Sequence, residues 1–230
     1  MNKLTEEQIQ ELYSFTRDHF VYHFDLQTEL VDHLANGIEV LLLQHPNLSF
    51  NEALQMEFKK FGVFGFQEVV EERRKALNKK YLKIIFNFYK AYFTIPKIML
   101  TVILTILLYT TLSSFTPNYQ NSIIMGLYLS FFAIAFIRLI KYNTILKKKK
   151  HKWMLEEILL TQMGLFSLFQ LPIHILNMPV EIESSYFLGL MSFFNVSIII
   201  LFYVMVFQIP SKAEDLLEKT YPEYKLTKTL

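Results

Sequence analysis

The sequence predicts an all-α protein, with a small cytosolic helical bundle followed by a four-helix transmembrane bundle. Four apolar runs of about twenty residues each follow residue 94, and at a helical rise of ~1.5 Å such a run covers the ~30 Å hydrocarbon core of a bilayer. Residues 1–94 instead mix apolar and charged positions at helical spacing. Lysine and arginine are concentrated in alternate segments between the apolar runs.

These patterns divide the chain into four parts. A cytosolic helical domain is expected at residues 1–78 and a basic amphipathic juxtamembrane segment at 79–95. Four transmembrane helices follow within 96–208, and a cytosolic tail covers 209–230. The spans are expected at about 96–115, 122–140, 155–176 and 186–207.

The cytosolic domain is expected to be a compact bundle of three or four short helices. Thr5 with Gln8 and Ser49 with Glu52 have the spacing of a capping box, so helices should begin after Thr5 and Ser49. Gly62 is suited to positive φ at the end of the third helix. The expected ranges are Glu6–Phe20, Leu26–Leu43, Phe50–Phe61 and a fourth helix that starts near Phe66 and runs into the juxtamembrane segment.

Basic residues predict the orientation of the spans. Positive charge stays on the cytoplasmic side of a membrane, and here basic and non-basic segments alternate, so both termini are expected inside. Residues 1–10 lack the apolar segment of a signal peptide, which agrees with a cytosolic N-terminal domain. Anionic lipid is expected to contact the lysines beside the membrane, namely Lys79, Lys80, Lys83, Lys147, Lys148, Lys149 and Lys150.

The edges of the spans carry further signals. Trp153 is expected at a membrane interface, where amphipathic rings collect. Arg138 and Glu157 lie close enough to the cytoplasmic face for their side chains to reach it. After the last span, Pro210 is expected to stop the helix, and Ser211-Lys-Ala-Glu214 reads as a third capping box.

The interiors of the expected spans contain few polar residues and no deep charge. Hydrogen bonding between helices is the favoured role for these polar residues. The alternative is a polar transport site between the spans. The intramembrane polar residues are Gln162, Gln170, His174 and Asn195.

Two motifs in the cytosolic domain resemble a known family. The run Glu29-Leu-Val-Asp-His33, followed by Ile38-Glu39 and by Phe61-Gly-Val-Phe-Gly65-Phe66, resembles the small N-terminal HAAS-type domains of bacterial membrane proteins associated with PadR-like transcriptional regulators. The resemblance covers about residues 5–80. It implies a cytosolic interaction or signalling module on a bacterial inner-membrane anchor, and it implies no catalytic residue.

One cluster has the composition of a metal site. His19 with His23 and Glu29 with His33 are four residues apart, a spacing that presents two ligands on one helical face. Asp32 lies beside them in sequence. Leu26 and Leu30 share that face, which favours histidines at the edge of an apolar core over metal ligands. No metal and no cofactor is therefore expected.

The remaining sequence favours a protein without catalytic activity. The chain has no cysteine, no glycine-rich phosphate loop and no nucleophile elbow. A membrane-embedded enzyme would have to use His151, Glu156 and Glu157. Residues 1–72 hold thirteen acidic and four basic residues, which argues against direct nucleic-acid binding.

The favoured function is a regulatory, signalling or scaffold protein of the bacterial inner membrane. Its lipid-anchored spans would carry residues 1–78, which are expected to bind a cytosolic or membrane protein partner. The alternative is a small transporter or permease subunit. Nothing in the sequence fixes the oligomeric state.

Overall fold

The computed structural model describes residues 3–163, 185–221 and 224. Within these residues all regular structure is helical and no strand is present, which confirms the all-α prediction. The chain divides into two compact units. The first comprises Met1–Lys79 and Lys149–Glu157, and the second comprises Lys80–Lys148 and Ile158–Leu230.

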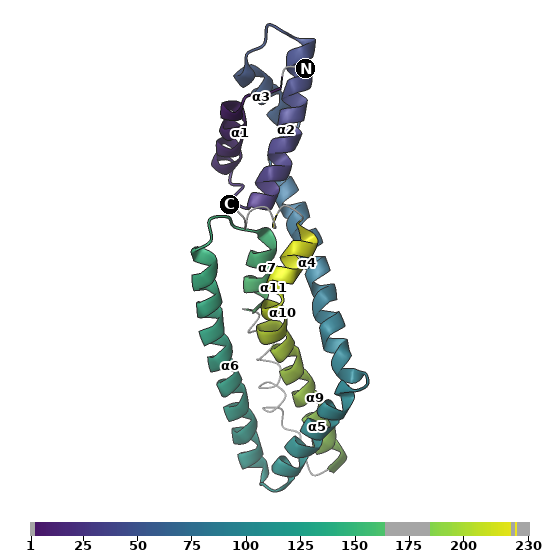
Figure 1. The fold of residues 1–230 in the computed structure, drawn as a ribbon. Coiled ribbons are helices and arrows are strands. Elements are labelled where there is room, and N and C mark those ends of the chain that lie inside the picture. The colour runs from purple at the N-terminus through teal and green to yellow at the C-terminus, as the bar shows by residue number, and fades with distance from the viewer. Residues whose placement is uncertain (1–2, 164–184, 222–223, 225–230) are drawn as a thin grey trace. The chain divides into compact units, whose positions relative to one another are not determined.

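The first unit is built on helices α1 to α3, the start of α4 and the first turn of α7. Figure 1 shows α1 and α2 lying side by side. One face of each helix is apolar, as the helical spacing of the leucines predicts. The helices are α1 (Glu6–Asp18), α2 (Phe24–Gln44), α3 (Phe50–Lys59), α4 (Gln67–Lys90) and α7 (Met154–Met163).

The core of the first unit combines an aliphatic layer with an aromatic cluster. Fully buried leucines of α1 and α2 form the layer, including Leu12, Leu26 and Leu34. The aromatic cluster lies where α1, α3 and the start of α4 meet, with edge-on ring contacts and centroids within 6.4 Å. Its members are Phe15, His19, Phe58, Phe61 and Phe66.

Two of the three expected capping boxes are present. The Thr5 hydroxyl accepts from the Gln8 N–H, and the Ser49 hydroxyl accepts from the Glu52 N–H. In return the Ser49 N–H donates to the Glu52 carboxylate at 2.9 Å. This hydrogen bond, followed by that of the Ser49 hydroxyl, lowers the pKa of Glu52.

The third capping box is a wrong prediction. Ser211 ends the short helix α10 (Ile209–Ser211), and its hydroxyl donates to the Gln208 carbonyl. Helix α11 (Ala213–Thr220) begins after Lys212 without a side-chain cap. Pro210 also does not stop the helix. The turn Val204–Gln208, just before Pro210, is π-helical, so its backbone hydrogen bonds join residues five apart. This wider turn relieves the clash of the proline ring with the preceding turn.

The second unit contains the long apolar helices. They are α5 (Lys97–Ser113), α6 (Pro117–Lys147) and α9 (Ser185–Tyr203), together with the 3-10 turn η1 (Ala91–Phe93), the π-helical turn η3 (Val204–Gln208), α10 and α11. Helix α5 packs along α9. A buried hydrogen bond from the Tyr128 hydroxyl to Asn195 Oδ1 (2.8 Å) joins α6 to α9.

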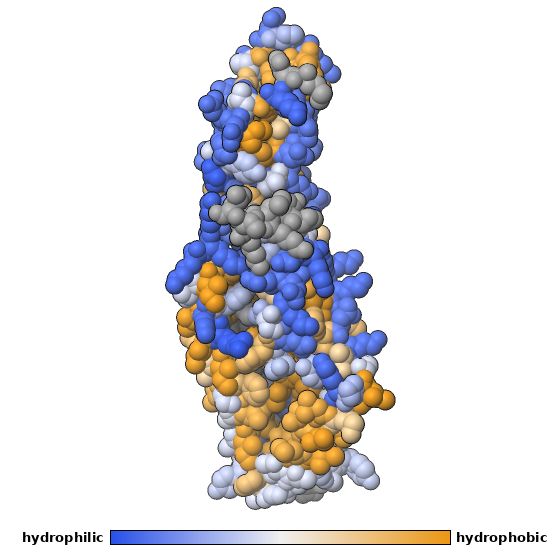
Figure 2. Space-filling model, viewed as in Figure 1, coloured by the Kyte–Doolittle hydropathy of each residue, from blue (hydrophilic) through white to orange (hydrophobic). Residues whose placement is uncertain are grey.

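The outer surfaces of α5 and α6 are apolar. Large hydrophobic side chains such as Met99, Leu129 and Ile137 are more than half exposed. Figure 2 shows hydrophobic side chains gathered over this part of the protein, whereas polar side chains predominate over the first unit. Apolar surface of this extent on packed helices is typical of contact with lipid.

Two described helices are long and apolar enough to cross a membrane, Tyr119–Lys147 and the continuous helix Ser185–Ser211. Gln67–Phe93 and Lys97–Ser113 meet at a 74° bend, and they add a third crossing if the bent pair is one span. The described residues thus contain two or three such helices, where the sequence predicts four. Most of the expected span 155–176 lies outside them.

The capping boxes give a matched pair of variants. Ser49→Ala removes a cap that the structure contains, at a cost of about 1 kcal/mol, so amides in the first turn of α3 should exchange with solvent about fivefold faster. Ser211→Ala is the control, because its hydroxyl caps no helix. Hydrogen exchange of the full chain in detergent measures both. If Ser211→Ala accelerated exchange at the start of α11 as much as Ser49→Ala does at the start of α3, the assignment of Ser49 as a cap and of Ser211 as no cap would be contradicted.

Candidate functional site: the loop interface

The segment 149–157, which follows α6, folds as part of the first unit. We call its contact with residues 23–25 and Arg74 the loop interface. Two backbone-anchored hydrogen bonds hold it. The Phe24 N–H donates to the Lys152 carbonyl at 2.7 Å, and the Met154 N–H donates to Asp25 Oδ1 at 3.2 Å.

Asp25 acts as an N-terminal cap for a helix that begins 129 residues later. The first N–H groups of any α-helix lack intrahelical partners, and the helix dipole favours a negative charge beside them. Asp25 supplies that carboxylate to α7 while it occupies the first turn of α2. Its second oxygen, Oδ2, is buried and has no partner among the described residues.

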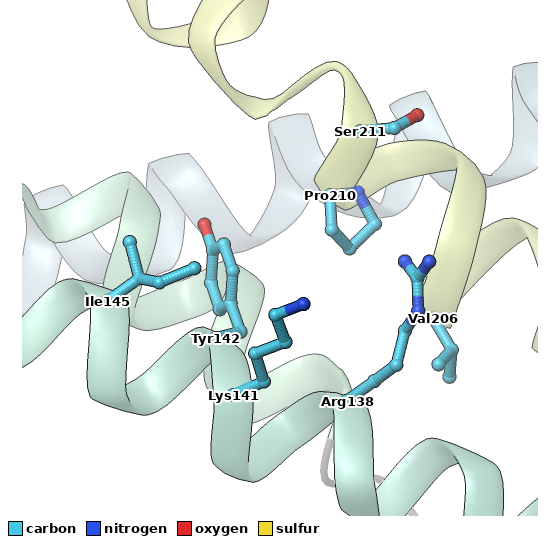
Figure 3. A pocket seen from close by; sticks show the side chains of 7 residues that line it. All are labelled: Arg138, Lys141, Tyr142, Ile145, Val206, Pro210 and Ser211. Carbon is cyan, nitrogen blue, oxygen red and sulfur yellow. The ribbon is translucent and has the colours of Figure 1, made fainter.

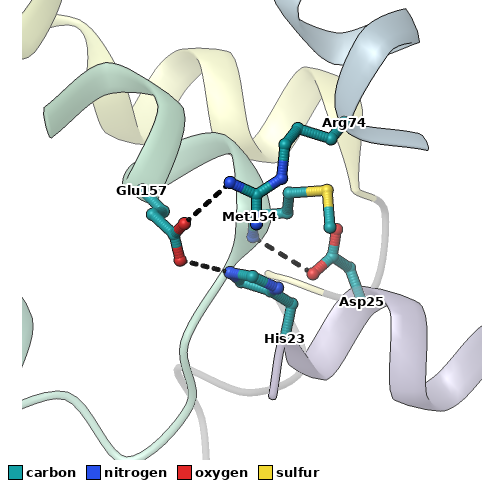
Figure 4. A network of polar contacts seen from close by, with 5 residues as sticks. All are labelled: His23, Asp25, Arg74, Met154 and Glu157. Carbon is teal, nitrogen blue, oxygen red and sulfur yellow. Dashed lines mark hydrogen bonds and ion pairs between the residues drawn. The ribbon is translucent and has the colours of Figure 1, made fainter. Parts of the chain in front are cut away.

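Glu157 joins three elements through its two carboxylate oxygens. His23 Nε2 lies 2.6 Å from Oε2, and the Arg74 guanidinium lies 3.4 Å from Oε1. His23 precedes α2, Arg74 belongs to α4 and Glu157 belongs to α7. Figure 4 shows His23 and Arg74 pointing at Glu157, with Asp25 and Met154 beside them.

Aromatic rings cover the same loop. The Trp153 side chain is 3% exposed, and its ring lies edge-on to Phe24 at 5.6 Å between centroids. The His151 ring lies 4.2 Å from Phe24. Burial, and secondarily the charge of Lys150, lowers the pKa of His151. Trp153 is expected at a membrane interface, and its ring is buried within the first unit.

The loop also contains an internal ion pair. Glu156 is almost fully buried, and Lys149 pairs with its carboxylate. Burying a carboxylate is costly unless it is paired, so Lys149 stabilises this turn of α7. The three residues named for a membrane enzyme are thus engaged elsewhere: His151 contacts Phe24, Glu156 pairs with Lys149, and Glu157 pairs with His23 and Arg74.

The five candidate metal ligands do not form one group, although Glu29, Asp32 and His33 line one pocket. Helix α1 ends at Asp18, α2 begins at Phe24, and Phe20 between them has a positive φ of 66°, so residues 19–33 are not one helix. His19 binds the Phe15 carbonyl, Glu29 pairs with Arg73 at 3.8 Å, and His33 lies against Phe61. Asp32 accepts a hydrogen bond from Asn36. The described part of the chain contains no group of residues able to hold a metal ion.

The other expected site residues have separate locations. Lys80 donates to the Thr220 hydroxyl at 3.1 Å, and Lys149 pairs with Glu156. The other expected lipid-contact lysines are exposed, namely Lys79, Lys83, Lys147, Lys148 and Lys150. Asn195 is buried and bonded at both ends of its amide, to Tyr128 and to the Met191 carbonyl. Gln162 lies in the last turn of α7, while Gln170 and His174 lie outside the described residues.

Asp25 and Arg74 of the loop interface are not predicted from the sequence, and Trp153 is predicted there with a different role. Trp153 is the sole tryptophan, so its fluorescence reports on the loop interface alone. Asp25→Ala should free the start of α7, shift the Trp153 emission to longer wavelength and increase its quenching by acrylamide. Asp32→Ala is the matched control, since Asp32 is an exposed α2 carboxylate outside the interface. Equal quenching in the two variants would contradict the interface.

The lowered pKa of His151 predicts a pH dependence. The packed loop binds fewer protons than the released loop between that lowered pKa and the ordinary value of 6.5. The contribution of His151 is therefore complete above pH 6.5 and is lost as the pH falls through the lowered pKa. Trp153 quenching in the full chain should rise over this range. His151→Phe, which keeps a ring against Phe24, should remove that rise, and an unchanged rise would exclude His151 as its source.

Comparisons with known proteins place this chain in no family. No family model matches it, and no curated protein or solved structure matches it either. The resemblance to HAAS-type domains therefore stays a prediction, and function must be argued from the geometry of the loop interface and of the helices.

Proposed function

We propose that this chain is a non-catalytic regulatory or scaffold protein of a bacterial inner membrane, with four spans and both termini in the cytoplasm. In this proposal the first unit binds a protein partner, and the loop interface couples that binding to the membrane helices. The observation that carries the proposal is that residues 149–157 fold into one unit with residues 1–79.

The loop interface supports an even number of crossings between residues 79 and 149, independently of the basic residues. Since residues 1–79 and 149–157 form one compact unit, both must lie on the same side of a membrane. The chain between them must then cross an even number of times. Helix α6 is one crossing, so α5 is the second.

The same reasoning supports a fourth span. Lys80 donates a hydrogen bond to Thr220, so in this proposal residues 80 and 220 lie on the same side of the membrane. Helices α5, α6 and α9 make three crossings, which leaves one more to be made. We assign it to the expected span 155–176, whose residues after Met163 lie outside the described part of the chain.

The coupling would pass through α7. Its first turn, Met154–Glu157, belongs to the first unit, and the helix continues into the second. That turn is bound by Asp25 of α2, by His23 just before α2, and by Arg74 of α4. A partner that shifts α2 against α4 would therefore change the contacts at the start of a membrane-directed helix.

One exposed turn of the first unit is suited to a protein partner. Val63 and Phe64 are 98% and 72% exposed, although nearby phenylalanines are in the core. Gly62 and Gly65 have φ of 74° and 55°, conformations that other residues rarely adopt. The turn thus has a fixed shape that presents two apolar side chains. The acidic excess of residues 1–72 favours a partner whose apolar groove has basic edges.

The absence of cysteine allows a direct test of topology. Tyr119→Cys, before the second span, should react with a membrane-impermeant maleimide in cells with a permeable outer layer. Lys148→Cys should react only after the inner membrane is opened. Both positions are exposed, so accessibility within the protein does not separate them. The opposite labelling pattern would overturn the orientation.

Photo-crosslinking in cells tests the partner. A photoreactive residue at Phe64 should give one discrete adduct with a protein whose contact surface carries basic residues. The matched control is Met56, which is 43% exposed on α3 of the same unit and should give none. Adding Asp25→Ala should alter the Trp153 signal but leave the Phe64 adduct. Crosslinks only to lipid, or equal adducts at both positions, would contradict the proposal.

A further inference from the structure

A small cationic pocket opens between the C-terminal half of α6 and the turns η3 and α10, which continue α9. Its volume is about 220 Å³. Figure 3 shows the Arg138 and Lys141 side chains extending toward Pro210 and Ser211 across it. Tyr142, Ile145 and Val206 complete the lining.

The pocket carries two positive charges without an opposite charge. No acidic side chain lines it, and the sequence contains no Asp or Glu between Glu72 and Glu156. Lys141 makes no ion pair within the described residues, and Arg138 lies over the Phe207 ring, 4.4 Å from its centroid. Stacking holds the guanidinium in place while its N–H edge stays available to an anion.

The depth of the pocket in the membrane indicates which kind of molecule would supply that anion. Arg138 lies nine residues before the end of α6 at Lys147, or ~14 Å along the helix axis. The expected span ends near residue 140, so the two cations lie where the hydrocarbon core meets the headgroup layer. Exposed apolar side chains of α6, including Ile137 and Ile140, border this level.

The size of the pocket also limits the ligand. Pockets for drug-sized molecules enclose roughly 300–1,000 Å³, so this one is too small for most metabolites. A phosphate group fits it, with arginine as a fork-shaped donor and lysine as a second charge. Apolar Ile145, Val206 and Pro210 are suited to the carbon atoms that adjoin a lipid phosphate.

We propose that this pocket binds the headgroup phosphate of an anionic phospholipid. The site goes beyond the function proposed above and depends only on α6 and α9 spanning a membrane. It is distinct from the exposed lysine run Lys147–Lys150, because it is a shaped cavity with an arginine held by an aromatic ring. The lipid would link α6 to η3 and α10 at the end of the last span and so fix their spacing on the cytoplasmic side.

Lipid retention by the full-length protein in detergent tests the site. Native mass spectrometry should show bound phosphatidylglycerol, and Arg138→Gln with Lys141→Gln should lower its occupancy about tenfold. The control is Lys3→Gln with Lys75→Gln, which removes equal charge from exposed positions of the first unit and should change occupancy less than about twofold. Equal losses in the two variants would overturn the pocket.

A second variant and two other ligands distinguish the remaining explanations. Ile145→Trp fills the cavity and keeps both charges, so retained lipid in this variant would show that charge alone attracts it. Phosphatidylcholine should bind at least about fivefold more weakly, since its headgroup has no net charge. Inorganic phosphate should not displace the lipid at millimolar concentration, and displacement would assign the site to free phosphate. Circular dichroism and elution volume confirm that each variant is folded.

Discussion

The Asp25 carboxylate at the first turn of α7 is the contact on which the organisation of the chain depends. The chain leaves the first unit at Lys79 and returns at Lys149. Closing a flexible loop of that length would cost about 4 kcal/mol in entropy. Most of the chain between these two residues is helical, in α5 and α6, and a helix is already rigid. The conformational entropy lost when the loop closes is therefore much smaller. A few hydrogen bonds and one buried tryptophan are then sufficient to hold residues 149–157 against α2 and α4.

Local features of the fold could be predicted from the sequence because their causes lie within a few residues. The capping boxes at Thr5 and Ser49 are three-residue patterns, and the apolar stripe of α2 repeats with the helix. The same pattern at Ser211 failed, because Pro210 and the widened turn before it decide where the helix ends. A capping motif predicts a helix start only where the preceding chain is free to leave the previous helix.

The candidate site could not be predicted, since its partners are far apart in sequence. His23 and Glu157 are separated by 134 residues, and no periodicity connects them. Reasoning from spacing instead grouped His23 with His19 and His33, which requires one continuous helix. Phe20 has a positive φ, so a single helix cannot continue through it, and the His19 ring packs in the aromatic cluster. The weak signal in the sequence is Trp153, a large ring directly after a lysine run and outside any apolar stripe.

Buried polar groups limit the stability of the loop interface. Two of its buried polar atoms, Asp25 Oδ2 and Arg74 Nε, have no partner within the described ranges. Each such group costs about 1–3 kcal/mol, which offsets much of the gain from the bonds that are made. A purely structural contact would gain stability from apolar side chains at these positions. In the function proposed above, polar groups that become hydrated when the contact opens would keep its closed and open states close in free energy.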